Sequence, residues 1–317
     1  MKIVEPKDEQ EPAAAESVSK KAVSKKAVSR KSVSQNSESE QSGPEQVEVV
    51  QEEPGIDAGA QLPEPAFQLT IAYSSLASRA ANIVLPTARP DQEILIIIQN
   101  PDGRTYPEPP VRDDVRVLHL DSKGVAKSRN AAIENSEGKY LVFADDDVTF
   151  DLASLDAICE HFENCPCSLV LGQATDLDGN LRKKYPSVTQ WLNRFNSGKA
   201  ATYEMVIRVP EIRAKGLRFD EDFGAGAVNY LGDEYIFIVD MLKQGLKAHF
   251  LPITMAAHPL DSSGSGWGTR SDLRARSVIF TRVFGPWAFL VRTAFILRHR
   301  KKVPNFTDMR KFILGTL

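Results

Sequence analysis

Short apolar runs alternate with amphipathic stretches from Phe67 onward. The run EILIIIQN is apolar on both faces, which is typical of a central strand covered by helices. The expected strands are FQLTIAYS, EILIIIQN, VRVLHLD, YLVFA and SLVLGQATD, and the expected helices between them are SLASRAANIVLP, GVAKSRNAAIENS and DLASLDAICEHFEN. This alternation predicts a doubly wound α/β sheet, in which ligands bind beyond the carboxyl ends of the strands.

The two ends of the chain have a different pattern. Residues 1–64 are rich in Glu, Lys, Ser, Gln and Pro with almost no aromatics, so they predict a disordered tail, either a solvated tether or a weak electrostatic attachment. The α/β domain is expected over 65–268 and a helical extension over 269–317. In that extension, residues 283–302 are too short and interrupted to span a membrane. They are expected to pack on the core or to lie in a membrane interface.

Charge and cysteine content indicate which classes of partner and which cellular compartment to expect. The net charge is −3 and no basic stripe is interleaved with aromatics, so no nucleic-acid partner is expected. Cys159, Cys165 and Cys167 lack the paired spacing of a zinc site, and reduced thiols in the cytoplasm are the expectation. The acidic start of the chain does not resemble a secretory signal.

Three adjacent carboxylates follow the strand YLVFA. Asp145, Asp146 and Asp147 repel one another unless a cation compensates them. In an extended chain alternate side chains share a side, so Asp145 and Asp147 face one way while Asp146 turns elsewhere. Two carboxylates on one side suit Mn²⁺ or Mg²⁺. The alternative is a turn with helix-capping residues.

Four stretches together resemble the inverting family 2 glycosyltransferases of GT-A fold. GVAKSRNAAIENSEGKYLVFADDDV is similar to the family's helix leading to its Asp-x-Asp strand. LRFDEDF and NYLGDEYIFIVD are similar to its Phe-Asp-Glu and Gly-Glu-Asp motifs, and AAHP to its late histidine. The resemblance covers Phe67 to Gly268 and implies a mostly parallel sheet flanked by helices and a nucleotide-sugar donor.

The resemblance also implies roles for individual residues. Asp145 contacts ribose or metal, Asp147 binds the metal, and His258 is the third metal ligand. Arg129 faces the donor. Asp102 matches the nucleoside-binding position, although QNPDG departs from the family pattern there and also fits a simple turn.

The catalytic base is left open between two residues. The family has Gly-Glu-Asp, whereas this chain has Gly-Asp-Glu, so position favours Glu234 and chemical identity favours Asp233. The loop after His258 is expected either to close over the donor with Trp267 as an apolar lid, or to be a flexible connector to the last helices. Arg270 or Arg274 beyond it is expected to reach phosphate oxygens.

The sequence therefore predicts a cytoplasmic, metal-dependent, inverting glycosyltransferase in polysaccharide or glycoconjugate synthesis. Its acceptor is expected to be a glycan or lipid-linked hydroxyl, with peripheral contact at the inner face of the membrane through the C-terminal segment. Two alternatives remain. One is a haloacid dehalogenase-like phosphatase, because VFADDDVT also fits its nucleophile strand with Asp145 and Asp147. The other is a non-catalytic scaffold.

Overall fold

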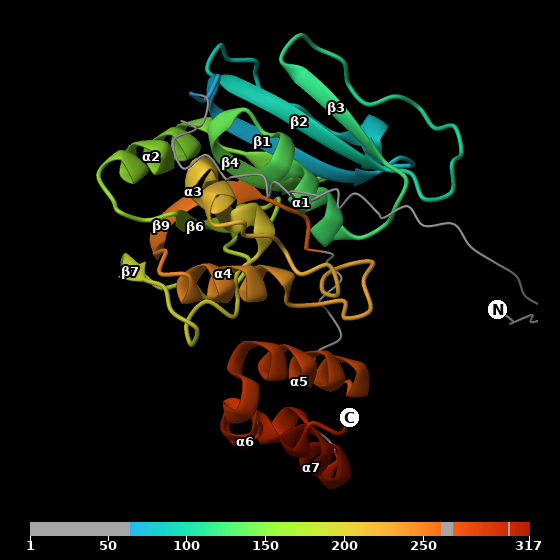
Figure 1. Cartoon of the computed structure of the whole chain (residues 1–317), viewed down its shortest axis with the longest axis vertical. Coiled ribbons are helices and arrows are strands. Elements are labelled where there is room, and N and C mark those ends of the chain that lie inside the picture. The colour runs from blue at the N-terminus through green and yellow to red at the C-terminus, as the bar shows by residue number, and fades with distance from the viewer. Residues whose placement is uncertain (1–63, 261–268, 304) are drawn as a thin grey trace, which may run out of the picture. The chain divides into compact units, whose positions relative to one another are not determined.

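A mixed sheet forms the centre of the fold (Figure 1). The computed structural model describes residues 64–260, 269–303 and 305–317, which belong to one compact unit that spans Ala60–Leu317; the predicted tail lies outside them, except Glu64. Within these residues nine strands join one sheet in the order β3-β2-β1-β4-β8-β6-β9-β5, with β7 paired to β9. Their bounds are β1 Phe67–Leu76, β2 Gln92–Gln99, β3 Val115–Leu120, β4 Gly138–Asp145, β5 Thr149–Phe150, β6 Leu169–Thr175, β7 Gln190–Trp191, β8 Met205–Arg208 and β9 Ala248–Ala257.

The direction of the strands places the chemistry at one end of the sheet. Strands β3, β2, β1 and β4 are mutually parallel, and β6 is parallel to β9, whereas β8 is antiparallel to both β4 and β6. In register, Ser74 of β1 lies beside Asp145 of β4. The carboxyl ends of β1, β2 and β4 therefore meet at a common edge, as the sequence pattern predicts.

Helices cover both faces of the sheet because alternate strand residues are apolar on each side. Helix α2 (Leu152–Glu163) packs on the face that carries Ile71, Tyr73 and Ile94. The other face is covered by α1 (Val125–Asn135), α3 (Val209–Ala214) and α4 (Asp233–Lys243). This three-layer arrangement confirms the predicted α/β class.

The helix predicted for residues 75–86 is wrong. Ser75 and Leu76 complete β1, and only a 3-10 turn, Ala80–Asn82, follows. From Ile83 the chain is extended, because Pro86 disfavours a helix before it and Ile83 is drawn into the core beside Tyr73.

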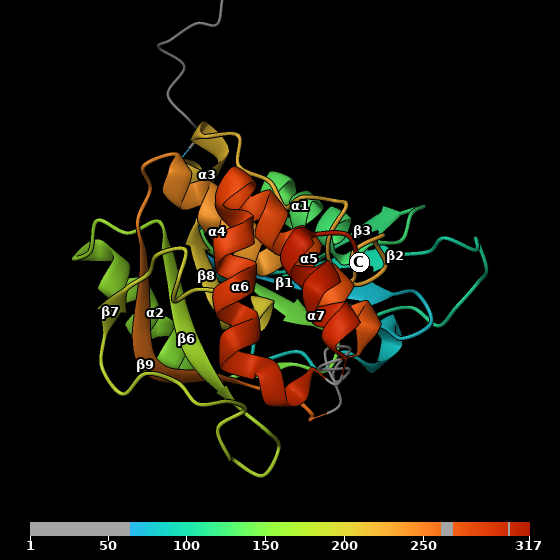
Figure 2. The same cartoon turned by 90° about the horizontal axis from the view of Figure 1, so that it is seen from below.

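Three helices form the C-terminal extension (Figure 2). They are α5 (Arg270–Phe284), α6 (Ala288–His299) and α7 (Phe306–Leu314), and they pack against one another. Helix α5 also packs on α4, where Gly232 leaves room for Ile279: a Cβ at Gly232 would lie 2.4 Å from Ile279 Cδ1. The extension thus supports the helix that carries Asp233 and Glu234.

By length and composition alone, the stretch Arg270–Lys302 could cross a membrane. This stretch is longer than residues 283–302, the segment considered from the sequence. The turn Gly285–Trp287 divides this stretch into α5 and α6. Buried Arg292 donates to Thr281 Oγ1 at 2.8 Å and to the Ile313 carbonyl at 3.1 Å. Of the two interruptions of the apolar pattern, Pro286 therefore lies in the turn between the helices and Arg292 is bonded inside the extension.

Candidate active site

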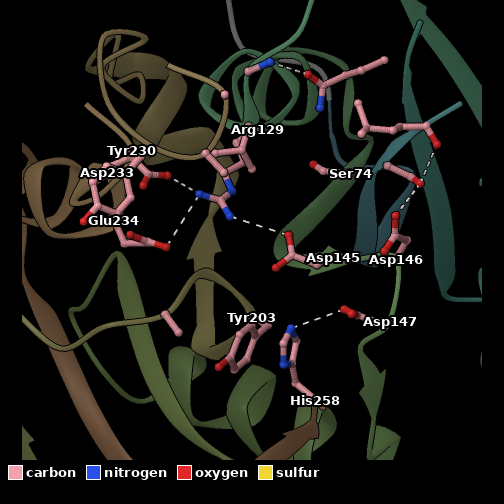
Figure 3. A pocket seen from close by; sticks show the side chains of 18 of the residues that line it. Ser74, Arg129, Asp145, Asp146, Asp147, Tyr203, Tyr230, Asp233, Glu234 and His258 are labelled. Atoms are coloured by element: carbon pink, nitrogen blue, oxygen red, sulfur yellow. Dashed lines mark hydrogen bonds and ion pairs between the residues drawn. The ribbon is translucent and has the colours of Figure 1, made fainter. Parts of the chain in front are cut away.

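A cavity of ≈ 630 Å³ lies at the carboxyl ends of β1, β2 and β4 (Figure 3). Its walls come from these strand ends, the start of α1, the start of α4 and the end of β9. The charged side chains among its lining residues are Arg79, Lys123, Arg129, Asp145, Asp146, Asp147, Arg182, Asp233, Glu234 and His258. Six of the eight residues predicted for the site are in this list, although they come from four separate parts of the chain.

The three aspartates point in different directions. Asp146 turns toward β1, where it accepts a hydrogen bond from Ser75 Oγ at 2.7 Å and pairs with Arg79. Burial raises the pKa of Asp146, opposed by Ser75 and Arg79. Asp145 lies toward Arg129, with Oδ1 3.7 Å from a guanidinium nitrogen, and Asp147 lies toward His258. The extended alternation predicted for these residues is wrong, because β4 ends at Asp145 and Asp146 and Asp147 lie in a turn. Asp146 nevertheless turns away from the other two carboxylates, as expected.

The contact between Asp147 and His258 fits a cation. His258 Nδ1 donates to the Pro259 carbonyl at 2.6 Å, so in the neutral ring Nε2 carries a lone pair. That Nε2 lies 3.3 Å from Asp147 Oδ1, a buried atom with no hydrogen-bond partner among the described residues. With a neutral ring, these two acceptors face each other, an arrangement that a bound cation between them would stabilise. Tyr203 stacks on the His258 ring, with centroids 4.7 Å apart, and fixes its orientation.

Arg129 connects the aspartate strand to α4 (Figure 3). Its buried guanidinium pairs with Asp233 and lies 3.7 Å from both Glu234 Oε1 and Asp145 Oδ1. Burial alone would lower the pKa of Arg129, but the adjacent carboxylates, Asp233 foremost, outweigh it and raise the pKa. Arg129 is therefore permanently charged and holds three carboxylates around it.

Asp233 and Glu234 occupy different environments. The Asp233 side chain is almost fully buried and fully engaged with Arg129. Glu234 keeps 22% of its side chain exposed, and Oε1 accepts a hydrogen bond from Thr202 Oγ1 at 2.9 Å. Burial, followed by the charge of Asp233, raises the pKa of Glu234 to about 8. A carboxylate with a raised pKa at a cavity wall is suited to accept a proton near neutral pH.

Comparison with known proteins bears on the family and the fold of this chain. Residues 85–220 match the family model described as Glycosyl transferase family 2. The chain contains a glycosyl transferase family 2 domain. No curated protein sequence matches the chain.

Solved structures match the fold of this family 2 domain. One is residues 1–349 of S. aureus TarS, with a TM-score of 0.50 and 12% identity, covering 78% of this chain and 74% of that chain. Another is the same TarS fragment in complex with UDP-GlcNAc, with a TM-score of 0.50 and 12% identity, covering 78% of this chain and 79% of that one. At this identity the likeness shows the fold alone. The resemblance to family 2 glycosyltransferases and the predicted GT-A fold are confirmed, and the matched domain is that of a glycosyltransferase.

Two family motifs of the glycosyltransferase meet through the side chain of Asn130 and the backbone of Phe219. Asn130 of the SRN stretch donates Nδ2 to the Phe219 carbonyl at 3.0 Å and accepts from the Phe219 amide at 2.7 Å. Gln99, at the end of β2, accepts from the Gly124 amide at 2.7 Å and fixes the start of α1. These bonds fix the position of α1, so that Arg129 reaches Asp233 at the start of α4.

Two predicted site residues lie away from the cavity lining. Asp102 sits in the turn after β2, where it accepts hydrogen bonds from the Tyr106 hydroxyl and the Arg104 amide, at 2.7 and 3.2 Å. Gln99, three residues earlier, lines the cavity instead. Arg270 is exposed at the start of α5, 3.8 Å from Asp308. Trp267 lies outside the described residues.

Several cavity residues of the glycosyltransferase carry little or no recognisable signal in the sequence. Arg79 follows β1 and pairs with Asp146, Lys123 precedes α1, and Arg182 donates to the His258 carbonyl at 2.8 Å. Tyr203 was missed as the residue that stacks on His258. Only the position of Arg79 shortly after the first strand gave a local signal, because the other contacts depend on segments distant in sequence.

Replacement of Arg129 by Met is expected to destabilise the protein by about 3–5 kcal/mol, because it leaves the buried Asp233 without its ion pair. The melting temperature should therefore fall by roughly 10 °C. The matched control is Arg270→Met, an exposed arginine whose loss should change stability by less than about 0.5 kcal/mol. Equal melting temperatures for both variants would show that Arg129 does not compensate the acidic cluster.

Proposed function

We propose that this glycosyltransferase is metal-dependent and inverting, and that it moves a sugar from a nucleoside diphosphate to an acceptor hydroxyl. The observation that carries the proposal is the pair of facing acceptors, Asp147 Oδ1 and His258 Nε2, in the same cavity as Asp145. Oxygen and imidazole donors of this kind fit Mn²⁺ or Mg²⁺.

Asp145, Asp147 and His258 would hold the cation. A bound Mn²⁺ or Mg²⁺ supplies a Lewis acid for the departing diphosphate. Lys123 and Arg182 add positive charge to the same cavity, where an anionic diphosphate would be attracted. Asp102 is proposed to contact the nucleoside of the donor, beyond Gln99. Arg270 is proposed to approach the phosphates of the donor when the donor binds.

Glu234 is proposed as the base that removes the proton of the acceptor hydroxyl. Its carboxylate is on α4, while the aspartates are at the end of β4, so acceptor and leaving group would occupy different sides of the sugar. Attack from the side opposite the leaving group inverts the anomeric centre. Asp233 acts through Arg129, as a positioning residue that keeps the guanidinium between Glu234 and Asp145.

Ligand binding tests the proposal most directly. TarS is solved in complex with UDP-GlcNAc, so UDP and UDP-GlcNAc are the first probes, followed by other nucleoside diphosphates. The melting temperature is expected to rise only when nucleotide and Mn²⁺ are both present, because the ligand binds the folded state alone. No shift with any nucleotide, with Mn²⁺ or Mg²⁺ present, would contradict the proposal.

We also propose a cytoplasmic protein with a glycan or lipid-linked acceptor and peripheral contact with the membrane. Trp287, Phe289 and Leu290 are exposed near the start of α6, and the basic segment 298–302 lies at its other end. Aromatic side chains insert at the lipid interface while basic ones attract anionic headgroups.

A vesicle experiment tests this contact. The protein is expected to sediment with vesicles that contain anionic lipid and to remain in solution with zwitterionic vesicles. A Trp287→Ser, Leu290→Ser variant should lose binding at least about tenfold, since each exposed apolar side chain contributes about 1.5–3 kcal/mol when buried. Val228→Ser is a control, since Val228 is exposed but lies outside the extension. Equal sedimentation of variant and parent would show that the start of α6 does not contact the membrane.

A further inference from the structure

Four side chains with soft metal-ligand atoms converge at the opposite end of the sheet from the cavity. They are His161 on the last turn of α2, Cys165 and Cys167 in the loop after α2, and His249 at the start of β9. Their ligand atoms all lie within 4.8 Å of one another. His249 and His258 are at opposite ends of β9, and nine residues of strand span about 30 Å. The cluster is therefore separate from the active site.

The spacing fits a tetrahedral ion. With Zn–S near 2.3 Å and Zn–N near 2.0–2.1 Å, tetrahedral ligand atoms lie roughly 3.3–3.8 Å apart. His161 Nε2 lies 3.0 Å from His249 Nδ1, and Cys165 Sγ lies 3.7 Å from the same nitrogen. The other ligand atoms are at most 4.8 Å apart, so shifts of up to about 1 Å would bring all four atoms to such a geometry.

The local backbone directs both sulfurs inward. Pro166 favours an extended conformation for Cys165, and alternate residues of an extended segment share a side, so Cys165 and Cys167 converge. Arg208 holds this loop by donating to the carbonyls of Phe162 and Cys165, at 2.6 and 3.3 Å. Trp191 stacks on His249 with ring centroids 4.2 Å apart and shields it.

Charge also favours a divalent ion here. Cys165 and Cys167 are buried, and two thiolates with two neutral imidazoles carry a charge of −2 that one Zn²⁺ cancels. Binding would release two thiol protons and form two Zn–S bonds. The resulting neutral site suits a buried position, and S₂N₂ donors select Zn²⁺ over Mn²⁺ or Mg²⁺.

We propose that His161, Cys165, Cys167 and His249 form a structural Cys₂His₂ zinc site that joins the end of α2 to the start of β9. All four protein ligands are supplied by the chain, so the site is closed, as in structural rather than catalytic zinc centres. This revises the expectation from sequence that the cysteines are simple thiols. The two cysteines were too few to indicate zinc, because the histidines come from segments 88 residues apart.

The test is metal analysis of the full chain, purified in reductant after growth with zinc and desalted into metal-free buffer to remove weakly held Mn²⁺ and Mg²⁺. About one Zn²⁺ per chain is expected in the parent. The Cys165→Ala, Cys167→Ala variant should retain at least about tenfold less zinc. The matched control, Cys159→Ala, removes a buried cysteine outside the cluster and should keep the parent stoichiometry. Asp147→Asn should also keep it, which separates this site from the active site.

A second readout does not depend on the stability of the variants. Co²⁺ added to zinc-depleted parent protein should give the charge-transfer absorption of thiolate bound to cobalt, and Cys159→Ala should give the same band. Three outcomes would overturn the proposal: a parent with neither zinc nor a cobalt–thiolate band, unchanged zinc in the double variant, or a Cys165–Cys167 disulfide in the reduced, purified protein.

Discussion

Asp147→Asn is expected to lower metal-dependent sugar transfer at least about a hundredfold. The amide has no negative charge to place opposite His258 Nε2, so the site loses the cation that stabilises the leaving diphosphate. The loss should appear mainly in kcat at saturating donor, and in a much higher Mn²⁺ concentration for half-maximal rate. Steady-state rates over a Mn²⁺ titration measure both effects.

Asparagine preserves the shape of Asp147, so the fold should survive. The melting temperature without metal is expected to stay within a few degrees of the parent value, because the side chain is partly exposed and its contact with Arg79 is long, at 3.5 Å. Asp178→Asn, at an exposed turn outside the cavity, is the matched control and should retain full activity. Full activity in Asp147→Asn would remove the premise of a metal-assisted reaction.

Glu234→Gln is expected to reduce turnover by about 10²–10⁴-fold while donor binding changes little. The amide keeps the hydrogen bond with Thr202 but accepts no proton from the acceptor hydroxyl. Donor affinity is measured from the melting shift with nucleotide and Mn²⁺, and turnover from product formation. Equal turnover in variant and parent would exclude Glu234 as the base.

Asp233→Asn distinguishes the two candidate bases. Since Asp233 is engaged with Arg129, its loss should lower the melting temperature as well as activity. Glu234→Gln should lower activity without that loss of stability. The reverse pattern would assign the base to Asp233.

The raised pKa of Glu234 predicts a pH dependence with a defined sign. Its pKa is about 8 in the folded protein, against about 4.3 in an unfolded chain, so between these values the folded state holds a proton that the unfolded state has released. The contribution of this group to stability is therefore greatest below about pH 4 and falls as the pH rises to about 8. Without divalent cation, the melting temperature of Glu234→Gln should be a few degrees above that of the parent at about pH 9. At about pH 5 the two melting temperatures should be nearly equal.

The same shift affects catalysis. The base must be ionised, so kcat/KM of the parent is expected to rise with pH and level off above about 8. The residual rate of Glu234→Gln should lack this rise. A parent profile that is flat from pH 6 to pH 9 would contradict the assignment.

Local signals explain which elements were predicted correctly. Strand β2 is buried at every residue and was recognised from its continuous apolar run. Helix α4 begins at Asp233, as its acidic first turn predicts. The helix predicted for residues 75–86 failed because helical spacing was outweighed by Pro86 and by burial of Ile83.

The sequence by itself determined the alternation of strands and helices, the acidic cluster at the end of a strand and the family resemblance, because each depends on residues close together in the chain. Only the tertiary structure decided that Asp147 faces His258, that Asp233 forms an ion pair with Arg129, and that His249 lies beside two cysteines. These contacts join segments far apart in sequence. Their geometry depends on strand order and register, which no local pattern of side chains specifies.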